Sequence, residues 1–227
     1  MMTIVDYIGI GLGVIAAYLI GSIPSAVWIG KRFYGIDVRE KGSKNAGATN
    51  TIRVLGLLPG LFVLLVDALK GWFAVYIGNF FGRFYTDIWG MISGAEYLTY
   101  YKLILGIIAI IGHALPIYVG FKGGKGVATM LGVIIGLFNP LLPLILGVFI
   151  VTFISSKFIS LSSILAAISF PIFYLSCGHW LNYEKYPVLI IFTILVGLFI
   201  IYTHRKNIKR MINNEEPKFK FKKTVDE

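Results

Sequence analysis

Long apolar runs separated by short polar segments constrain this sequence more than any other feature. A hydrocarbon core about 30 Å thick requires about 20 apolar residues when a helix crosses it, and fewer when neighbouring helices shelter the span. Seven segments meet or approach this length, namely residues 5–29, 55–77, 103–119, 127–138, 141–154, 159–176 and 186–203. The chain is 57% hydrophobic and 14% charged, which is outside the range of ordinary soluble domains. We therefore expect an all-α polytopic membrane bundle of about seven transmembrane helices.

The predicted topology follows from the distribution of Lys and Arg. With the N-terminus outside and seven crossings, all but four of the 21 basic residues fall on the cytoplasmic side, in agreement with the positive-inside rule. The exceptions are Lys70, Arg83, Lys102 and Lys185. The fourth and fifth segments could instead form one helix interrupted at "NPLLP", but the two most basic segments would then lie on opposite faces. We expect a tight outer turn at "NPLLP" and a cytoplasmic C-terminus.

The sequence shows no internal repeat, so we expect one transmembrane domain, residues 1–203, followed by a basic cytoplasmic tail, residues 204–227. No basic residue precedes the first apolar run, which favours a first span over a cleaved signal peptide. The net charge of +10 is distributed between the spans. It therefore indicates membrane lipid and anionic ligands as partners, and not nucleic acid.

The first polar segment on the inner face, residues 31–53, has six basic residues against two acidic ones and includes "KGSKNAGATN". Its glycines allow a close approach of the backbone that other residues forbid. Its hydroxyl, amide and guanidinium groups are typical phosphate ligands, and the candidates are Ser43, Asn45, Thr49, Asn50 and Arg53. A plain turn segment, with lysines that only follow the topology rule, is the alternative.

The second polar segment reads "GHALPIYVGFKGGKGVAT", in which Lys122 and Lys125 alternate with Gly123, Gly124 and Gly126 just before a predicted helix. Glycine amides at a helix N-terminus, with lysines beside them, can bind phosphate. The spacing is not that of a Walker A loop. A short flexible loop is the alternative, but two lysines with no acid nearby favour phosphate binding.

The remaining candidates are single polar residues at or within the spans. His204 and Asn207 lie three apart on one helical face where the last span ends, although the basic residues around them also fit a membrane anchor. His113 lies at the end of the third span. Asp67 and Lys70, also three apart, can pair at membrane depth, either as a functional or as a structural ion pair. No Cys/His cluster has metal spacing, so we expect no metal and no cofactor.

Six motifs carry a resemblance to a known family: "GSIPSAVWIGK", "KGSKNAGATNTIRVLG", "DALKG", "GHALPIYVGFKGGKGVAT", "SLSSI" and "HRKNIKRMI". In this order they resemble the bacterial acyl-phosphate:glycerol-3-phosphate acyltransferases, and they extend over nearly the whole chain. Ordered motifs of this length are far more specific than an isolated glycine pattern. The chain departs from the family at Lys44, where Gly is usual, and at Thr203, where Arg is common.

The resemblance implies that a fatty acyl group passes from acyl phosphate to the 1-hydroxyl of sn-glycerol 3-phosphate at the cytoplasmic face of the bacterial inner membrane. The products are lysophosphatidic acid and phosphate, in the first acylation of phospholipid synthesis. The implied ligands are Ser43, Arg53, Lys122, Lys125, Ser160, His204 and Asn207, assisted by the amides of Gly123 and Gly124. It also implies that a substrate phosphate accepts the hydroxyl proton, with His113 or His204 as the alternative base.

Two other functions fit part of this pattern. A secondary transporter of a phosphorylated solute would share the proline-broken helices and the polar pair, but it predicts inverted repeats and a site near the midplane. A membrane scaffold that recruits anionic lipid would leave the glycines unexplained. The clustering of polar groups on one face favours the acyltransferase.

Overall fold

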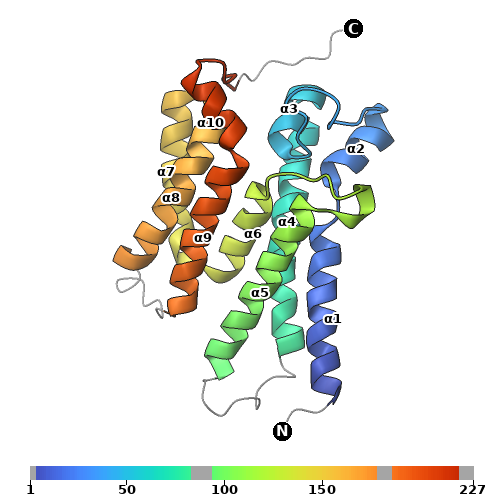
Figure 1. Ribbon diagram of the computed structural model, residues 1–227, viewed down its shortest axis with the longest axis vertical. Coiled ribbons are helices and arrows are strands. Elements are labelled where there is room, and N and C mark those ends of the chain that lie inside the picture. The colour runs from blue at the N-terminus through green and yellow to red at the C-terminus, as the bar shows by residue number, and fades with distance from the viewer. Residues whose placement is uncertain (1–3, 83–93, 178–185, 220–227) are drawn as a thin grey trace. The chain divides into compact units, whose positions relative to one another are not determined.

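A computed structural model describes residues 4–82, 94–177 and 186–219, and the regular elements in these ranges are all helical (Figure 1). The α-helices are α1 (Ile4–Gly21), α2 (Ser25–Tyr34), α3 (Ala48–Leu55), α4 (Leu57–Phe81), α5 (Gly94–Ala114), α6 (Val127–Leu137), α7 (Leu142–Ser156), α8 (Ile159–Cys177), α9 (Pro187–Thr203) and α10 (Arg205–Ile212). Two short 3₁₀ helices are η2 (Ile117–Val119) and η3 (Asn139–Leu141). The predicted all-α class is confirmed. Arg83, Lys185 and the tail beyond residue 219 lie outside the described residues, so their predicted sides of the membrane stay predictions.

The described residues form two compact units, divided between Leu137 and Phe138. Unit 1 contains α1 to α6, and unit 2 contains α7 to α10. The predicted boundary after residue 203, between a membrane domain and a tail, is a separate question and stays a prediction.

The central helix of unit 1 is α4, which contacts α1, α3, α5 and α6. Its contact with α6 is close because both helices contribute glycines. A Cβ at Gly71 would overlap the Thr129 carbonyl, and a Cβ at Gly132 would overlap the Ala68 carbonyl. Small residues let backbones approach where lipid supplies no hydrophobic driving force between helices. The helix contacts thus hold the starts of α3 and α6 in fixed places on α4.

The first predicted span, residues 5–29, is a bent pair and not one continuous helix. α1 ends at Gly21, α2 begins at Ser25, and the two helices are bent by 42°. Pro24 lies in the break and has no amide hydrogen with which to continue the helical bonds. In the break the Ile23 carbonyl accepts the Ser25 amide at 3.1 Å and Lys70 Nζ at 2.9 Å.

Part of the first polar segment is helical, which the sequence did not predict. α3 begins after Gly47 and carries Thr49, Asn50 and Arg53. Gly56, at a φ of 101°, joins α3 directly to α4. The helix therefore fixes three predicted ligands relative to the bundle.

Within the described residues, four helices are long and apolar enough to cross a membrane, and six spans result if each bent pair counts as one. α6 has only 11 residues and is shorter than a bilayer core. The turn η3 separates α6 from α7, so the fourth and fifth predicted segments are separate helices, as expected. The chain is thus an all-helical polytopic membrane protein with four to six candidate spans.

In unit 2, α8 contacts both α7 and α9. The core between them is aromatic: Phe138 meets Phe170 edge to face, with ring centroids 4.9 Å apart, and stacks on Phe192 at 5.9 Å. Beyond the core, α10 is bent by 58° from α9. The bend directs α10 away from the axis of α9.

Lys218 and Phe219, in the segment after α10, pack within unit 2 against α7 and the residues that follow it. The amide of Phe219 donates to the Lys157 carbonyl at 2.8 Å, and its ring meets that of Phe153 with centroids 5.6 Å apart. Lys218 lies over the ring of Phe158, with Nζ 5.8 Å from the centroid. The segment after α10 therefore returns to the connection between α7 and α8.

Candidate active site

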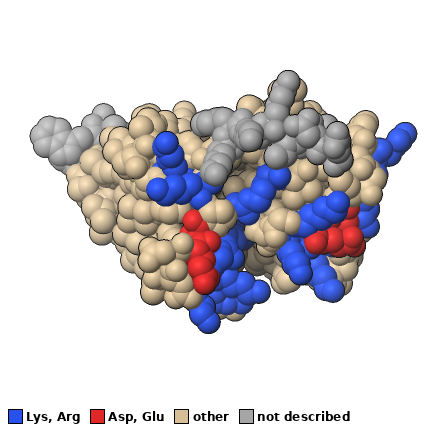
Figure 2. Space-filling model, turned by 90° about the horizontal axis from the view of Figure 1, so that it is seen from above, with Lys and Arg blue, Asp and Glu red and all other residues tan. Residues whose placement is uncertain are grey.

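The predicted ligands form two clusters, one in each unit. The unit 1 cluster comes from the first loop (residues 35–47), α3, the end of α5 and the glycine-rich segment (residues 115–126), and its predicted members are Ser43, Asn45, Thr49, Asn50, Arg53, His113, Lys122, Gly123, Gly124 and Lys125. The unit 2 cluster contains Ser160, His204 and Asn207. Seen from above, the space-filling view shows several Lys and Arg side chains and only a few Asp and Glu side chains (Figure 2).

Asn50 organises the first loop. Its side chain is 1% exposed, and its Oδ1 accepts the Ser43 amide at 2.7 Å. Its Nδ2 donates to the carbonyls of Val38 at 2.7 Å and Lys41 at 3.2 Å. A Cβ at Gly42 would overlap Oδ1, which explains the glycine at this position. Asn50 therefore shapes the loop from within, in place of the direct substrate contact that the sequence suggests.

Ser43 and Arg53 face solvent. Both side chains are exposed, and neither takes part in a hydrogen bond or ion pair with the described residues. Asn45 and Thr49, from the same stretch, are half-buried. Of the polar residues predicted here, Ser43 and Arg53 are the donors most open to an external anion.

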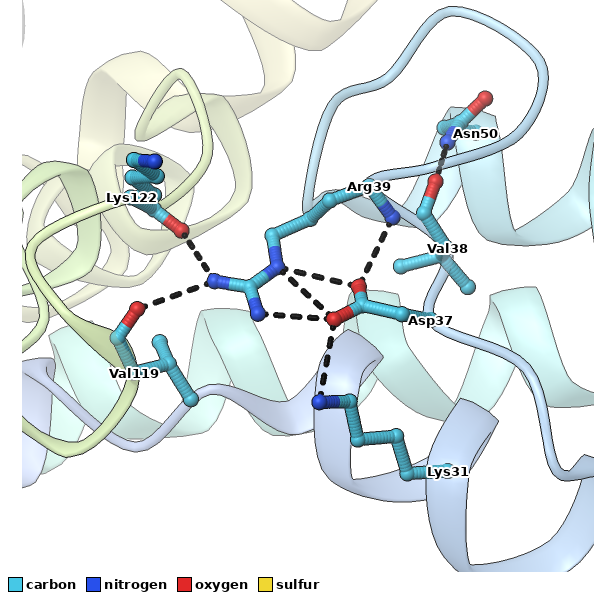
Figure 3. Close-up of polar contacts among 7 residues, drawn as sticks. All are labelled: Lys31, Asp37, Val38, Arg39, Asn50, Val119 and Lys122. Atoms are coloured by element: carbon cyan, nitrogen blue, oxygen red, sulfur yellow. Dashed lines mark hydrogen bonds and ion pairs between the residues drawn. The ribbon is translucent and has the colours of Figure 1, made fainter.

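Arg39, which the sequence did not single out, joins the first loop to the glycine-rich segment (Figure 3). Its Nε and one terminal nitrogen donate to the Asp37 carboxylate, at 3.0 and 2.8 Å. The other terminal nitrogen donates to the carbonyls of Val119 at 3.0 Å and Lys122 at 3.3 Å. All three guanidinium nitrogens are thus engaged within the chain.

Asp37 is neutralised by basic neighbours. Its side chain is 8% exposed, and Lys31 Nζ lies 3.2 Å from the same carboxylate. Hydrogen bonds from Arg39 hold the pKa of Asp37 well below its usual range, in spite of the burial that opposes ionisation. The carboxylate is therefore ionised at neutral pH, and its charge is cancelled by residues outside the predicted ligand set.

The glycine-rich segment folds back onto the end of α5. The amide of Gly123 donates to the Ala114 carbonyl and that of Gly124 to the His113 carbonyl, both at 3.1 Å. A Cβ at Gly124 would overlap the His113 ring. The two amides predicted to bind phosphate are therefore engaged within the chain, and the glycines are needed for close packing. Lys122 is exposed, whereas Lys125 is half-buried.

His113 belongs to a buried polar group beneath that segment. Asp67 Oδ1 accepts the Ser25 hydroxyl at 2.7 Å and Lys70 Nζ at 2.8 Å, and it lies 3.7 Å from His113 Nδ1. Lys70 also donates to the Ile23 carbonyl in the break between α1 and α2, at 2.9 Å. These contacts support the structural alternative for the Asp67 and Lys70 pair. They also place His113 behind the glycine-rich segment, with a side chain only 5% exposed.

Glu216, from the segment after α10, joins the unit 2 cluster. Ser160 Oγ donates to its Oε1, Asn207 Nδ2 donates to the same oxygen at 2.7 Å, and Arg210 Nε donates to Oε2 at 2.7 Å. Its side chain is 4% exposed. Burial raises the pKa of Glu216, but the hydrogen bonds from these partners outweigh burial and lower it below its ordinary value. Two predicted ligands thus already hold an anionic group of the chain itself.

His204 connects α9 to α10. It is 4% exposed, and its Nδ1 lies 2.9 Å from the Ile200 carbonyl. Because a carbonyl oxygen only accepts, Nδ1 carries the proton of this bond.

Sequence reasoning missed three residues that organise these clusters: Asp37, Arg39 and Glu216. A signal existed for the first two, because the Arg39 amide donates to Asp37 Oδ1 at 3.0 Å, a local turn that an Asp two residues earlier permits. No local signal existed for Glu216, which contacts Ser160 across 56 residues of sequence. Within the described residues, no group of three or more His, Cys, Asp or Glu side chains could hold a metal ion.

Comparisons with known proteins agree with one another. Residues 11–214 match the family model for glycerol-3-phosphate acyltransferase. The glycerol-3-phosphate acyltransferase of Fusobacterium nucleatum is 41% identical over 208 residues, covering 92% of this chain and 97% of the relative. That of Listeria monocytogenes serovar 1/2a is 44% identical over 205 residues, covering 90% and 94%.

Solved structures show the same likeness. The crystal structure of PlsY (YgiH), an integral membrane glycerol 3-phosphate acyltransferase, in its glycerol 3-phosphate form superposes with a TM-score of 0.76 at 36% identity. The lysophosphatidic acid form of that protein superposes with a TM-score of 0.73 at 35% identity. Each match covers 93% of this chain and 96% of the solved one.

Proposed function

Because this chain belongs to the glycerol-3-phosphate acyltransferase family, we propose that it transfers a fatty acyl group from acyl phosphate to the 1-hydroxyl of sn-glycerol 3-phosphate. The family match over residues 11–214 carries this conclusion. The glycerol 3-phosphate and lysophosphatidic acid forms of the similar PlsY structure support the acceptor and the product. The family assignment replaces the transporter and scaffold alternatives.

The proposed phosphate ligands in unit 1 are Ser43, Arg53, Lys122 and Lys125. The exposure of Ser43, Arg53 and Lys122 supports this placement. An arginine can bind two oxygens of a phosphate at once, and a serine hydroxyl can donate a charge-assisted hydrogen bond. Ser160, His204 and Asn207 in unit 2 remain predicted ligands, with Glu216 holding two of them.

The proposed reaction needs little beyond positioning. The 1-hydroxyl oxygen forms a bond to the acyl carbon, the bond from that carbon to the phosphate oxygen breaks, and phosphate leaves. The hydroxyl proton passes to a substrate phosphate. Basic side chains stabilise the charge that develops on the acyl oxygen and on the leaving phosphate. Both alternative bases, His113 and His204, are buried, which favours the substrate phosphate as the proton acceptor.

Acyl phosphate is proposed as the donor because it is the donor of the family that the motifs resemble. Purified protein would be supplied with radiolabelled glycerol 3-phosphate and, in parallel, with acyl phosphate, acyl-CoA or acyl-carrier protein. Lysophosphatidic acid should form with acyl phosphate alone. Equal turnover with acyl-CoA would contradict the proposed donor while leaving the family assignment intact.

We place the protein in the bacterial inner membrane with seven crossings, the N-terminus outside, and both the active site and the tail in the cytoplasm. The basic residues support this orientation. The seventh crossing requires the 11-residue α6 to cross as a short, sheltered helix. Cysteines introduced near Lys44, Lys122 and Lys218 should react only from the cytoplasmic side, and one near Arg83 only from outside. Labelling of the Lys44 and Lys218 positions from opposite faces would rule out this topology.

A further inference from the structure

Arg39 is the point at which the two candidate phosphate segments of unit 1 are joined. It belongs to the first loop, yet one of its terminal nitrogens donates to Val119 and Lys122, some 80 residues away in sequence. Figure 3 shows the side chain extending from the loop to these two carbonyls. Lys122 is itself a proposed ligand, so this bond acts on the backbone that carries the ligand.

Hydrogen bonds to Asn50 hold the first loop at the other end of this connection. Asn50 binds the Val38 carbonyl next to Arg39 and also holds the amide of Ser43. Hydrogen bonds join Ser43 to Asn50 and Asn50 to Val38. Val38 is followed in the chain by Arg39, which bonds to the Lys122 carbonyl. Two proposed ligands from distant parts of the sequence are connected through these bonds.

Arg39 is oriented by Asp37 and is not open to a ligand. The carboxylate binds Nε and a terminal nitrogen together, which fixes the plane of the guanidinium. The remaining terminal nitrogen then points at the two carbonyls. Since all three nitrogens are engaged, Arg39 differs from the exposed Arg53, whose guanidinium has no partner among the described residues.

We propose that Arg39 is a positioning residue for the acyl transfer, which fixes the spacing between the first loop and the glycine-rich segment so that ligands from both can bind one substrate phosphate. The proposal rests on the proposed phosphate site of unit 1. It assigns Arg39 to substrate affinity and not to the chemical step, because the residue does not contact the reacting atoms.

Arg39→Lys tests the proposal, since it keeps the charge but loses the planar fork that reaches Asp37 and two carbonyls together. We expect the KM for glycerol 3-phosphate to rise roughly tenfold while kcat stays within about threefold of wild type. Asp37→Asn should shift KM in the same direction by a smaller factor, because the amide orients Arg39 less firmly. It also serves as the second variant if Arg39→Lys does not fold.

Lys31→Ala is the matched control. Lys31 binds the same carboxylate oxygen as Arg39 but is not bonded to the glycine-rich segment. If Lys31, Asp37 and Arg39 formed only a stabilising ion network, Lys31→Ala and Arg39→Lys would both lower the unfolding temperature and leave the KM for glycerol 3-phosphate unchanged. We expect KM in Lys31→Ala to stay within about twofold of wild type.

A second measurement is independent of activity. Spin labels at positions 41 and 121, both exposed, report the spacing of the two segments. Their distance distribution should broaden in Arg39→Lys and remain narrow in Lys31→Ala. An unchanged distribution overturns the proposal. A broadened distribution with an unchanged KM also overturns it, and in that case the phosphate site of unit 1 fails as well. If the wild-type protein did not acylate glycerol 3-phosphate, the proposed function itself would be contradicted.

Discussion

Each unit buries one carboxylate among basic residues outside its long helices, Asp37 in unit 1 and Glu216 in unit 2, but the two are held by different kinds of neighbour. Asp37 in unit 1 is bound by Arg39 and Lys31, neither of which is a predicted ligand. Glu216 in unit 2 is bound by Ser160 and Asn207, which are predicted ligands, and by Arg210. The pKa of each acid lies below its ordinary value, so both are charged at neutral pH.

The difference concerns the residues predicted to bind phosphate, which are open in one unit and already bonded in the other. In unit 1 Asp37 is bound by residues that are not predicted ligands, and Ser43 and Arg53 stay open to an external anion. In unit 2 the donors are already oriented by an anion of the chain. We infer that unit 1 supplies the larger share of substrate affinity, and that Glu216 keeps Ser160 and Asn207 in place.

The largest expected effect is that of Arg53→Lys. The substitution keeps the positive charge but removes the second of two parallel donors, and each charge-assisted hydrogen bond is worth about 1.5 to 3 kcal/mol. We expect kcat/KM to fall roughly a hundredfold, with the protein still folded in the membrane. Steady-state kinetics with acyl phosphate and glycerol 3-phosphate would measure it. Wild-type kinetics in a folded Arg53→Lys would remove unit 1 as the main phosphate site.

Ser43→Ala should have the next largest effect and should exceed Ser160→Ala. Ser43 is an open donor, so its loss should lower kcat/KM by roughly ten- to a hundredfold. Ser160 already donates to Glu216, so its removal mainly loosens a preformed cluster, and we expect a loss of less than about tenfold. Both variants delete one hydroxyl, which makes them matched. The opposite order would mean that unit 2 binds the more tightly held phosphate.

The sequence was informative where a physical signal is local and failed where contacts are distant. Apolar length predicted the long helices, and the distribution of basic residues predicted the separation of α6 from α7 near Pro140. Donor chemistry predicted Ser43 and Arg53 as ligands, which stays a prediction, and the structure shows that both are exposed. The helix α3 and the internal bonding of Asn50 were missed, because a short polar helix has no apolar run to reveal it. The role of Glu216 was missed because its partners are brought to it only by folding.

Glu216→Gln should have a smaller effect on activity but a distinct dependence on pH. The amide keeps the shape but accepts weaker hydrogen bonds, so we expect kcat/KM to fall roughly threefold to tenfold. Glu216 has a lowered folded pKa, so it contributes stability that is present above the ordinary Glu pKa of about 4.3 and lost as the pH falls through the folded value.

Thermal unfolding from pH 7 down to pH 3 would measure this contribution. The wild type should be more stable than Glu216→Gln at pH 7, and the difference should shrink below about pH 4. A KM for glycerol 3-phosphate that falls in Glu216→Gln would contradict the orienting role. It would show that Glu216 competes with the substrate for Ser160 and Asn207.

The smallest expected effect is that of Lys44→Gly, in the loop of unit 1. Lys44 has a φ of 57°, in the left-handed region that suits glycine, and its side chain is exposed. Relief of that conformation, about 1 to 2 kcal/mol, is partly offset by the greater freedom of glycine in the unfolded chain, about 0.5 to 1 kcal/mol. We expect stability to rise by up to about 1 kcal/mol and kcat/KM to stay within about twofold. Lys41→Gly, which removes the same charge at a position without a positive φ, should instead destabilise the protein. If Lys44→Gly is inactive while Ser43→Ala and Arg53→Lys keep wild-type kinetics, the first loop is not the phosphate site, and the contrast between the two units loses its basis.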